Sequence, residues 1–182
     1  MAKLVANTYG EALFSLAVEE NRVDDFYAEV KAIREILAAN PEFDTLMNHP
    51  KITKEEKEKV ISDVFSGRTS DEMTGFMKLL LRKERYGDIA GILDFFSAKV
   101  KEYKNIGVAY VTTAEALKDT QKASIQKKLL ETTGCKEMEM HYSVDESLIG
   151  GVVIRIGDRV VDSSIKTKLE ELKKELSDLQ VG

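Results

Sequence analysis

Tryptophan is absent from this sequence, and cysteine, histidine and proline are scarce. Because Cys135 is the only cysteine, an intrachain disulfide is excluded and a reducing compartment is expected. No stretch approaches the roughly 20 consecutive apolar residues that span a bilayer, and the N-terminus lacks a basic-then-apolar signal pattern. These absences predict a protein made and kept in the cytosol, without direct membrane insertion, unless a partner holds it at a membrane.

An excess of positive charge is also missing. The formal net charge of the 182 residues is −5, and 32% of the residues are charged. Nucleic acids and anionic membranes select proteins with basic surfaces, so neither is expected as the main partner. The 43% content of hydrophobic residues is typical of a folded protein with a sizeable core.

The residue types that carry most enzyme chemistry are few and poorly spaced for it. His49 and His141 lie far from each other, and neither has a metal-ligand spacing with Cys135. The Gly-x-Ser-x-Gly elbow of serine hydrolases is absent, and the neighbouring Asp145 and Glu146 are typical of a solvated turn. The sequence therefore predicts no enzyme activity, no catalytic residues, no metal and no cofactor.

The adjacent glycines Gly150 and Gly151 could suggest a phosphate-binding loop. Such loops place their glycines at the start of a helix, whereas these glycines lead into a β-branched apolar run. Glycine in a strand more often marks a bulge or the close approach of another backbone. The pair is therefore predicted to shape a sheet.

Apolar residues three or four positions apart dominate residues 1–105, the period of amphipathic helices. Asn40-Pro41 and Pro50 interrupt the pattern, because proline suits the first helical position and disfavours helix in the residue before it. About six helices with short connections are expected, the pattern of an antiparallel bundle.

Two capping boxes are expected to begin helices within this part. Thr53 with Glu56, and Thr69 with Glu72, have the T-x-x-E spacing in which each side chain satisfies the other residue's backbone N–H. Gly67 between them is a suitable helix stop.

The apolar period changes to two after residue 105, which indicates strands and a second domain. Strands are expected at residues 108–113, 138–144, 149–156 and 159–161, with a helix between the first two. Gly157-Asp158 favours a two-residue hairpin turn of type II′. The predicted fold class is mostly α with a small α/β domain: an N-terminal six-helix bundle at 1–105, followed by a small mixed α/β C-terminal domain at 106–182.

Several helices carry apolar residues that the bundle core does not explain. The last helix is expected to begin near Asp162 or Ser163. Its stripe either covers the small sheet or pairs with a partner's helix. In the first and fifth helices, apolar residues outside the core stripes either lie deep in the bundle or face a partner. The last helix's stripe is Ile165, Leu169, Leu172, Leu176 and Leu179; the surplus residues are Leu4, Val5, Ala12, Phe14 and Leu79.

Three stretches together resemble the delta subunit of bacterial F-type ATP synthase, the counterpart of the mitochondrial oligomycin sensitivity-conferring protein. The strongest is "SLIGGVVIRIGDRVVDSSIKTKLEEL" at 147–172, an apolar run with glycine, then Ile-Arg-x-Gly-Asp and a helix. "ANTYGEALFSLA" at 6–17 resembles the family's first helix, although Asn7 stands where the family commonly has arginine. "FMKLLLRKERYGDIAGILDFF" at 76–96 resembles the junction of its fifth and sixth helices.

The resemblance implies a non-catalytic stator subunit that links the catalytic head to the peripheral stalk and so resists rotor torque during ATP synthesis. In that family the bundle binds the N-terminal helix of an alpha subunit through its first and fifth helices, and the C-terminal domain meets the b subunits of the stalk. Such a subunit is peripheral, on the cytoplasmic side of the bacterial plasma membrane. The head-binding residues implied by position are Tyr9, Ala12, Leu13, Leu16, Phe76, Met77, Leu80 and Leu81.

A protein adaptor, including one that binds nucleic acid through the small mixed domain, is the alternative hypothesis. The absence of a basic stripe, and of a Gly-x-x-Gly loop with basic residues, disfavours its RNA-binding form.

Overall fold

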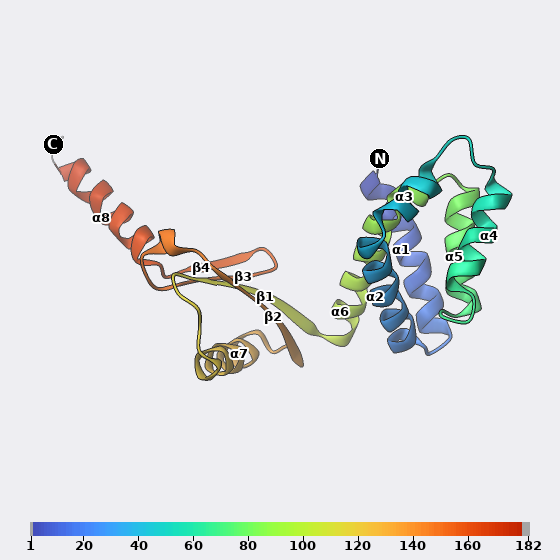
Figure 1. The fold of residues 1–182 in the computed structure, drawn as a ribbon. Coiled ribbons are helices and arrows are strands. Elements are labelled where there is room, and N and C mark those ends of the chain that lie inside the picture. Colours follow the sequence, from blue (N-terminus) through green and yellow to red (C-terminus); the bar gives the residue numbers. More distant parts are fainter. Residues whose placement is uncertain (1, 180–182) are drawn as a thin grey trace. The chain divides into compact units, whose positions relative to one another are not determined.

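The computed structural model describes the backbone of residues 2–179 and the side chains of residues 3–173. The chain divides into two compact units, Met1–Lys101 and Glu102–Gly182 (Figure 1). The last helix of the first unit continues to Lys104 before the first strand begins, so the period changes a few residues after this division.

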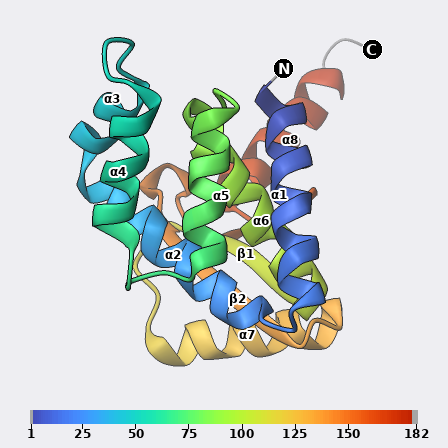
Figure 2. The same cartoon turned by 90° about the vertical axis from the view of Figure 1, so that its right-hand side faces the viewer.

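Six α-helices and one 3₁₀ turn build the described part of the N-terminal unit. They are α1 (Ala2–Glu19), α2 (Val23–Ala39), α3 (Pro41–Asn48), α4 (Lys54–Phe65), α5 (Asp71–Arg82), the turn η1 (Tyr86–Asp88) and α6 (Ile89–Lys104). Their connections are short, and α4 and α5 lie side by side in both views of the ribbon (Figures 1 and 2). The predicted six-helix bundle is confirmed.

Local hydrogen bonds explain where α4 and α5 begin. The predicted capping box of α4 is present: the Glu56 N–H donates to Thr53 Oγ1 at 3.3 Å, and the Thr53 N–H donates to Glu56 Oε2 at 3.0 Å. The second box is wrong by one residue, because Ser70 has the extended backbone before α5 and accepts the Met73 N–H at 3.3 Å. The Thr69 hydroxyl instead lies 3.1 Å from that of Thr74.

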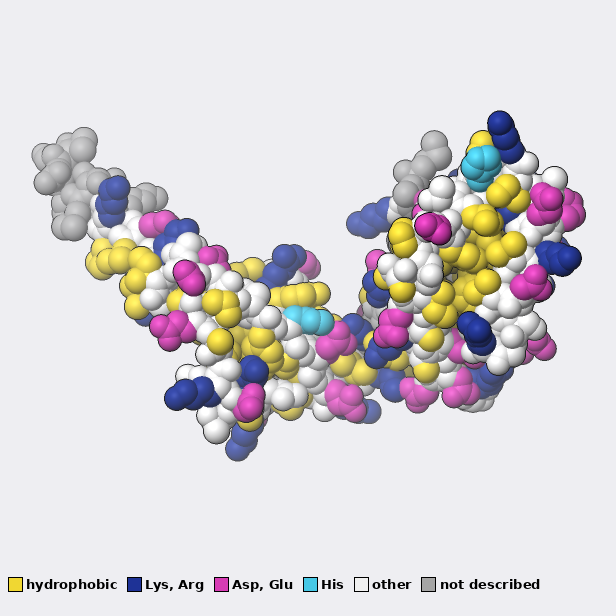
Figure 3. Space-filling view, viewed as in Figure 1, with side chains coloured by type: hydrophobic (Ala, Val, Ile, Leu, Met, Phe, Trp, Pro, Cys, Tyr) yellow, Lys and Arg dark blue, Asp and Glu magenta, His cyan; other side chains and the backbone are white. Residues whose placement is uncertain are grey.

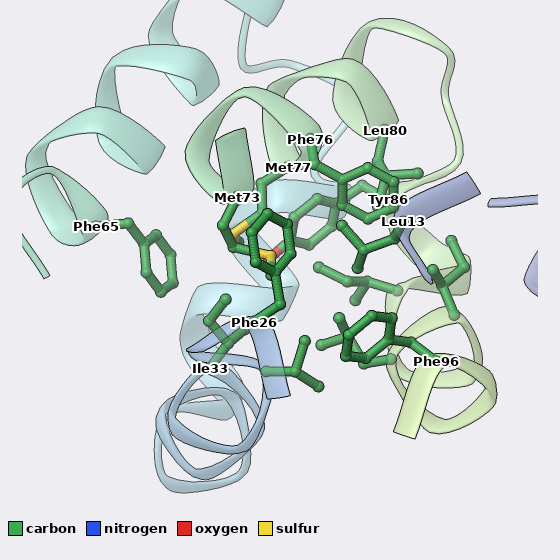
Figure 4. Close-up of a cluster of buried hydrophobic side chains, with 14 of the residues drawn as sticks. Leu13, Phe26, Ile33, Phe65, Met73, Phe76, Met77, Leu80, Tyr86 and Phe96 are labelled. Atoms are coloured by element: carbon green, nitrogen blue, oxygen red, sulfur yellow. The ribbon is translucent and has the colours of Figure 1, made fainter. Parts of the chain in front are cut away.

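Buried apolar side chains from all six helices form one core (Figure 4). Gly10 allows α1 to approach α6 closely, since a Cβ there would lie 2.5 Å from the Phe95 ring and 3.1 Å from the Ile92 carbonyl oxygen. The largest fully buried side chains include Phe26, Phe65, Phe96, Leu13, Ile33 and Ile61.

One polar atom is enclosed in this core without a partner. The hydroxyl of Tyr86 has no hydrogen bond, and the side chain lies inside the cluster, 3% exposed (Figure 4). Burial, and to a lesser degree the Asp44 carboxylate, raise the pKa of Tyr86. An unsatisfied buried hydroxyl lowers stability, because it has given up hydrogen bonds to water without replacement.

Replacement of Tyr86 by phenylalanine should therefore stabilise the N-terminal unit by about 1 kcal/mol, since it removes the orphaned hydroxyl and keeps the ring. Urea denaturation followed by far-UV circular dichroism measures the change. Tyr27→Phe, at a half-buried position on α2, is the matched control and should change stability by less than about 0.5 kcal/mol. A loss of stability in Tyr86→Phe would mean that the hydroxyl is hydrogen-bonded in solution.

The described part of the C-terminal unit is a four-stranded mixed sheet with two helices and a 3₁₀ turn. Its elements are β1 (Ile106–Thr113), α7 (Asp119–Thr133), β2 (Glu137–Val144), the turn η2 (Glu146–Leu148), β3 (Val152–Ile156), β4 (Arg159–Asp162) and α8 (Ile165–Leu179). The strand order is β2-β1-β3-β4; β1 and β2 are parallel, joined through α7, and the other pairs are antiparallel. The predicted fold class, mostly α with a small α/β domain, is confirmed.

A helix packs against one face of the sheet, and the other face carries exposed side chains. Figure 1 shows α7 against one face, where the Tyr142 hydroxyl donates to the Lys122 carbonyl oxygen at 3.4 Å. Alternate residues of β1 point to this face, and Val111 is buried there. On the opposite face Tyr110 stacks on His141 with ring centroids 4.9 Å apart.

The run from residue 149 to 156 is only partly a strand. The predicted hairpin after it is confirmed, with Gly157 at φ +55° and no positive φ at Asp158, as a type II′ turn requires. The predicted strand start at Ile149 is wrong: Ile149 follows η2 in the left-handed region at φ +65°, and β3 begins at Val152. The Ile149 N–H donates to the Glu146 carbonyl oxygen at 3.1 Å, so this residue closes η2 and does not begin the strand.

Candidate partner-binding surfaces

The predicted head-binding residues of α1 and α5 meet in the bundle core, but most of them face inward. Ala12 alone among them is exposed. Tyr9 and Leu16 are partly buried against the core, and the buried members are Leu13, Phe76, Met77, Leu80 and Leu81. Their binding role stays a prediction, and a partner would have to contact their exposed neighbours first.

Apolar and small residues beside these positions are accessible. Leu79 is 42% exposed although the adjacent Leu80 is fully buried, and Leu4 near the start of α1 is 71% exposed. A Cβ at Gly75 would have no atom within 4 Å. Small residues such as Gly75 and Ala12 leave room for another backbone to approach. This set, Leu4, Ala12, Gly75 and Leu79, is called the α1/α5 surface below.

Ion pairs hold both ends of α5. Arg82 Nε donates to Glu58 Oε1 at 2.6 Å and Arg82 Nη2 donates to Glu58 Oε2 at 2.9 Å, a two-point contact with α4. These bonds lower the pKa of Glu58. At the other end Arg22 donates to Glu72 Oε2 at 3.3 Å. These exposed ion pairs add to the buried face of α5, formed by Met73, Phe76, Met77 and Leu80, which leaves Leu79 on the accessible side.

Gly150 and Gly151, between η2 and β3, lie against the residues that lead from β4 into α8. The Ser163 N–H donates to the Val152 carbonyl oxygen at 2.9 Å, and the Ile165 N–H donates to that of Gly150 at 3.0 Å. Gly151 has φ +84°, and a Cβ there would lie 2.3 Å from the Ser163 carbonyl oxygen. The prediction that the glycines serve shape is confirmed.

Side-chain hydrogen bonds fix the direction in which α8 leaves the sheet. The buried Ser164 accepts the Thr167 N–H at 3.2 Å, while Asp162 accepts the Ser164 N–H at 2.8 Å and the Thr167 hydroxyl at 2.7 Å. These bonds lower the pKa of Asp162. The helix begins at Ile165, slightly later than predicted, because Asp162 still belongs to β4.

The apolar stripe of α8 remains accessible. Ile165, Leu169 and Leu172 are 44%, 51% and 54% exposed, and Figure 3 shows hydrophobic side chains along the described part of this helix. The side chains of Leu176 and Leu179, predicted on the same stripe, lie outside the described residues. Within the unit, α8 contacts η2.

Among the described residues no group of three or more His, Cys, Asp and Glu side chains could hold a metal ion. In that same part of the chain, none of the helices combines the length and the apolar composition needed to cross a membrane.

A family model for the ATP synthase delta (OSCP) subunit matches residues 5–176. The chain belongs to this family. The delta-family assignment confirms the resemblance inferred from residues 6–17, 76–96 and 147–172, and with it the F-type ATP synthase context.

Relatives of this delta-family chain match it over nearly its whole length. ATP synthase subunit delta of Lachnoclostridium phytofermentans is 52% identical over 182 residues, 100% of both chains. The protein of that name from Desulforamulus reducens is 37% identical over 172 residues, 94% of each chain. A chain of the Toxoplasma gondii mitochondrial ATP synthase hexamer, solved by cryo-electron microscopy, has a TM-score of 0.76 over 94% of this chain and 96% of that chain. At 20% identity, that likeness shows a shared fold.

Which apolar residues of the delta-family chain are accessible was only partly predictable. Leu4, Ala12 and Leu79 were singled out because they lie off the core stripes, and all three are exposed. Gly75 was missed, because a helical glycine without side-chain neighbours leaves no signal in hydrophobic periodicity.

Proposed function

We propose that this chain is the non-catalytic stator subunit of an F-type ATP synthase, joining the N-terminal helix of an alpha subunit in the catalytic head to the b subunits of the peripheral stalk. The observation that carries the proposal is the division of a delta-family chain into two compact units, each with accessible apolar side chains. As such a subunit it is peripheral, on the cytoplasmic side of the bacterial plasma membrane.

The head contact is assigned to the α1/α5 surface. An amphipathic helix laid across it would contact Leu79 and Leu4 and approach closely over Ala12 and Gly75, the usual manner of helix-in-groove recognition. A link that resists torque needs slow dissociation, and apolar contacts of this kind reach nanomolar affinity, about −12 kcal/mol. The link needs no nucleotide, metal or cofactor.

Calorimetric titration of the full chain with a synthetic peptide from the alpha-subunit N-terminus tests the head contact. Heat reports on this interaction directly, whereas the chain has no tryptophan to report on it by fluorescence. Saturable one-to-one binding, with nanomolar to low-micromolar affinity, is expected. No binding at tens of micromolar by the folded protein would overturn the proposal.

Leu79→Asp should weaken this binding at least tenfold, about 1.4 kcal/mol, because it places a charge in an apolar contact. The variant should stay folded, since Leu79 is an exposed helical position. Ala32→Asp, a comparable change at an exposed position of α2, is the matched control and should bind as the unmodified chain does. Equal affinities for all three proteins would remove Leu79 from the contact.

A further inference from the structure

The apolar stripe of α8 has the spacing of a coiled-coil seam. Ile165, Leu169 and Leu172 are separated by four and then three residues, and the sequence continues the alternation with Leu176 and Leu179. This is the heptad pattern in which positions a and d face a partner helix. A helix that covers only its own sheet needs no such strict alternation over several turns.

The charged residues of α8 differ between the positions that border the seam and the outer face of the helix. Counting from Leu169 as position a, the residues that border the seam at positions e and g are Lys166, Lys168, Lys173 and Glu175. Glu170 and Glu171 fall on the outer positions b and c. Bordering residues set partner choice in coiled coils through their charge. Three of these four bordering residues are lysines, so the first turns of the seam favour a helix with acidic residues at the positions that face them.

We propose that α8 pairs in a coiled coil with a helix of the b subunits that carries an apolar heptad seam bordered by glutamate or aspartate. This inference rests on the proposed function and assigns the stalk contact to one helix face and one partner chemistry.

A second copy of the chain does not fit this seam in a parallel pair. In a parallel pair, the residue at position g of one helix faces the residue five positions further along the other. Lys168 would then face Lys173 of the second copy, a like-charge contact that costs stability and disfavours self-association.

The base of α8 is built to present this face rigidly. Ser164, Thr167 and Asp162 hold the first turn by hydrogen bonds, and the close backbone contact at Gly151 ties that turn to β3. A seam held in one orientation binds with less loss of conformational freedom than a mobile one.

Binding of the full chain to the soluble segment of the b subunits, measured at low and at high salt, tests the inference. The variant L169Q/L172Q should lose at least about 30-fold in affinity, because it removes two seam residues. Lys168→Glu should lose about fivefold at low salt and less at high salt, since salt screens exposed charges. E170Q/E171Q, on the outer face, is the matched control and should bind within about twofold of the unmodified chain.

The possible outcomes distinguish a failure of this inference about α8 from a failure of the proposed stalk-binding function. If the b segment binds the unmodified chain and L169Q/L172Q equally well, α8 is not the contact, and the stalk function still stands. If the b segment does not bind the unmodified chain at all, the stalk function fails and the inference fails with it. Circular dichroism of each variant confirms that the comparison is between folded proteins.

Discussion

Replacing Gly151 by alanine is expected to destabilise the C-terminal unit by about 3–5 kcal/mol, the combined cost of backbone strain and overpacking. The backbone at this position has φ +84°, which residues with a Cβ adopt at a cost. The added Cβ would lie 2.3 Å from the Ser163 carbonyl oxygen and 3.0 Å from the Ser164 Cα. Both neighbours are backbone atoms at the start of α8, so neither can rotate away.

Gly157 provides a matched control for this substitution. It also has a positive φ, +55°, but a Cβ there would have no atom within 4 Å. Gly157→Ala should therefore cost only the strain of the turn, about 1 kcal/mol. Hydrogen exchange resolved along the chain, with thermal unfolding, measures both, and protection should fall in β3 and α8 of Gly151→Ala before it falls in the bundle. Equal losses in the two variants would contradict the close approach.

Leu80→Asp should unfold the N-terminal unit at neutral pH. The side chain is fully buried in the cluster of Figure 4. Its loss alone costs about 3–5 kcal/mol, as for other buried leucines, and a carboxyl group without a hydrogen-bond partner adds several more. Together these approach the whole stability of a typical domain, about 5–15 kcal/mol.

Leu79→Asp, one residue away, should leave the helical signal in circular dichroism and the melting temperature nearly unchanged. The pair isolates burial as the variable, since both changes are Leu→Asp in the last turn of α5. A folded Leu80→Asp with weakened binding of the alpha-subunit peptide would place Leu80 on the surface and contradict the packing described above.

Leu79 and Leu80 also show how much of this structure the periodicity of apolar residues predicts. Spacings of three or four residues and the later alternation predicted the six helices and the mixed sheet, because each pattern matches a backbone repeat that buries one face. The same spacing could not say whether Phe76 or Leu80 faces the core or a partner, since both environments select apolar side chains. Only the packed neighbours of α5 decide that.

Positions that depend on a single backbone angle were predicted less well. Thr69 and Ser70 are equally good caps by composition, and the extended conformation of Ser70 chooses between them. The sequence predicts a bulge or a close backbone approach at Gly151 without choosing between them, because the approaching group, the Ser163 carbonyl, lies twelve residues away and is set by the pairing of β3 with β4.

The position of β1 in the sheet has a mechanical consequence. The chain leaves α6 and enters β1 at once, and β1 is flanked by β2 on one side and β3 on the other. Tension directed along β1 from its N-terminal end would act on both ladders in shear, so that many hydrogen bonds share the load at the same moment. A strand at the edge of the sheet would instead be peeled away one bond after another. In the stator role proposed above, where the chain would hold two bodies together under repeated torque, entry through an inner strand would be the stronger attachment.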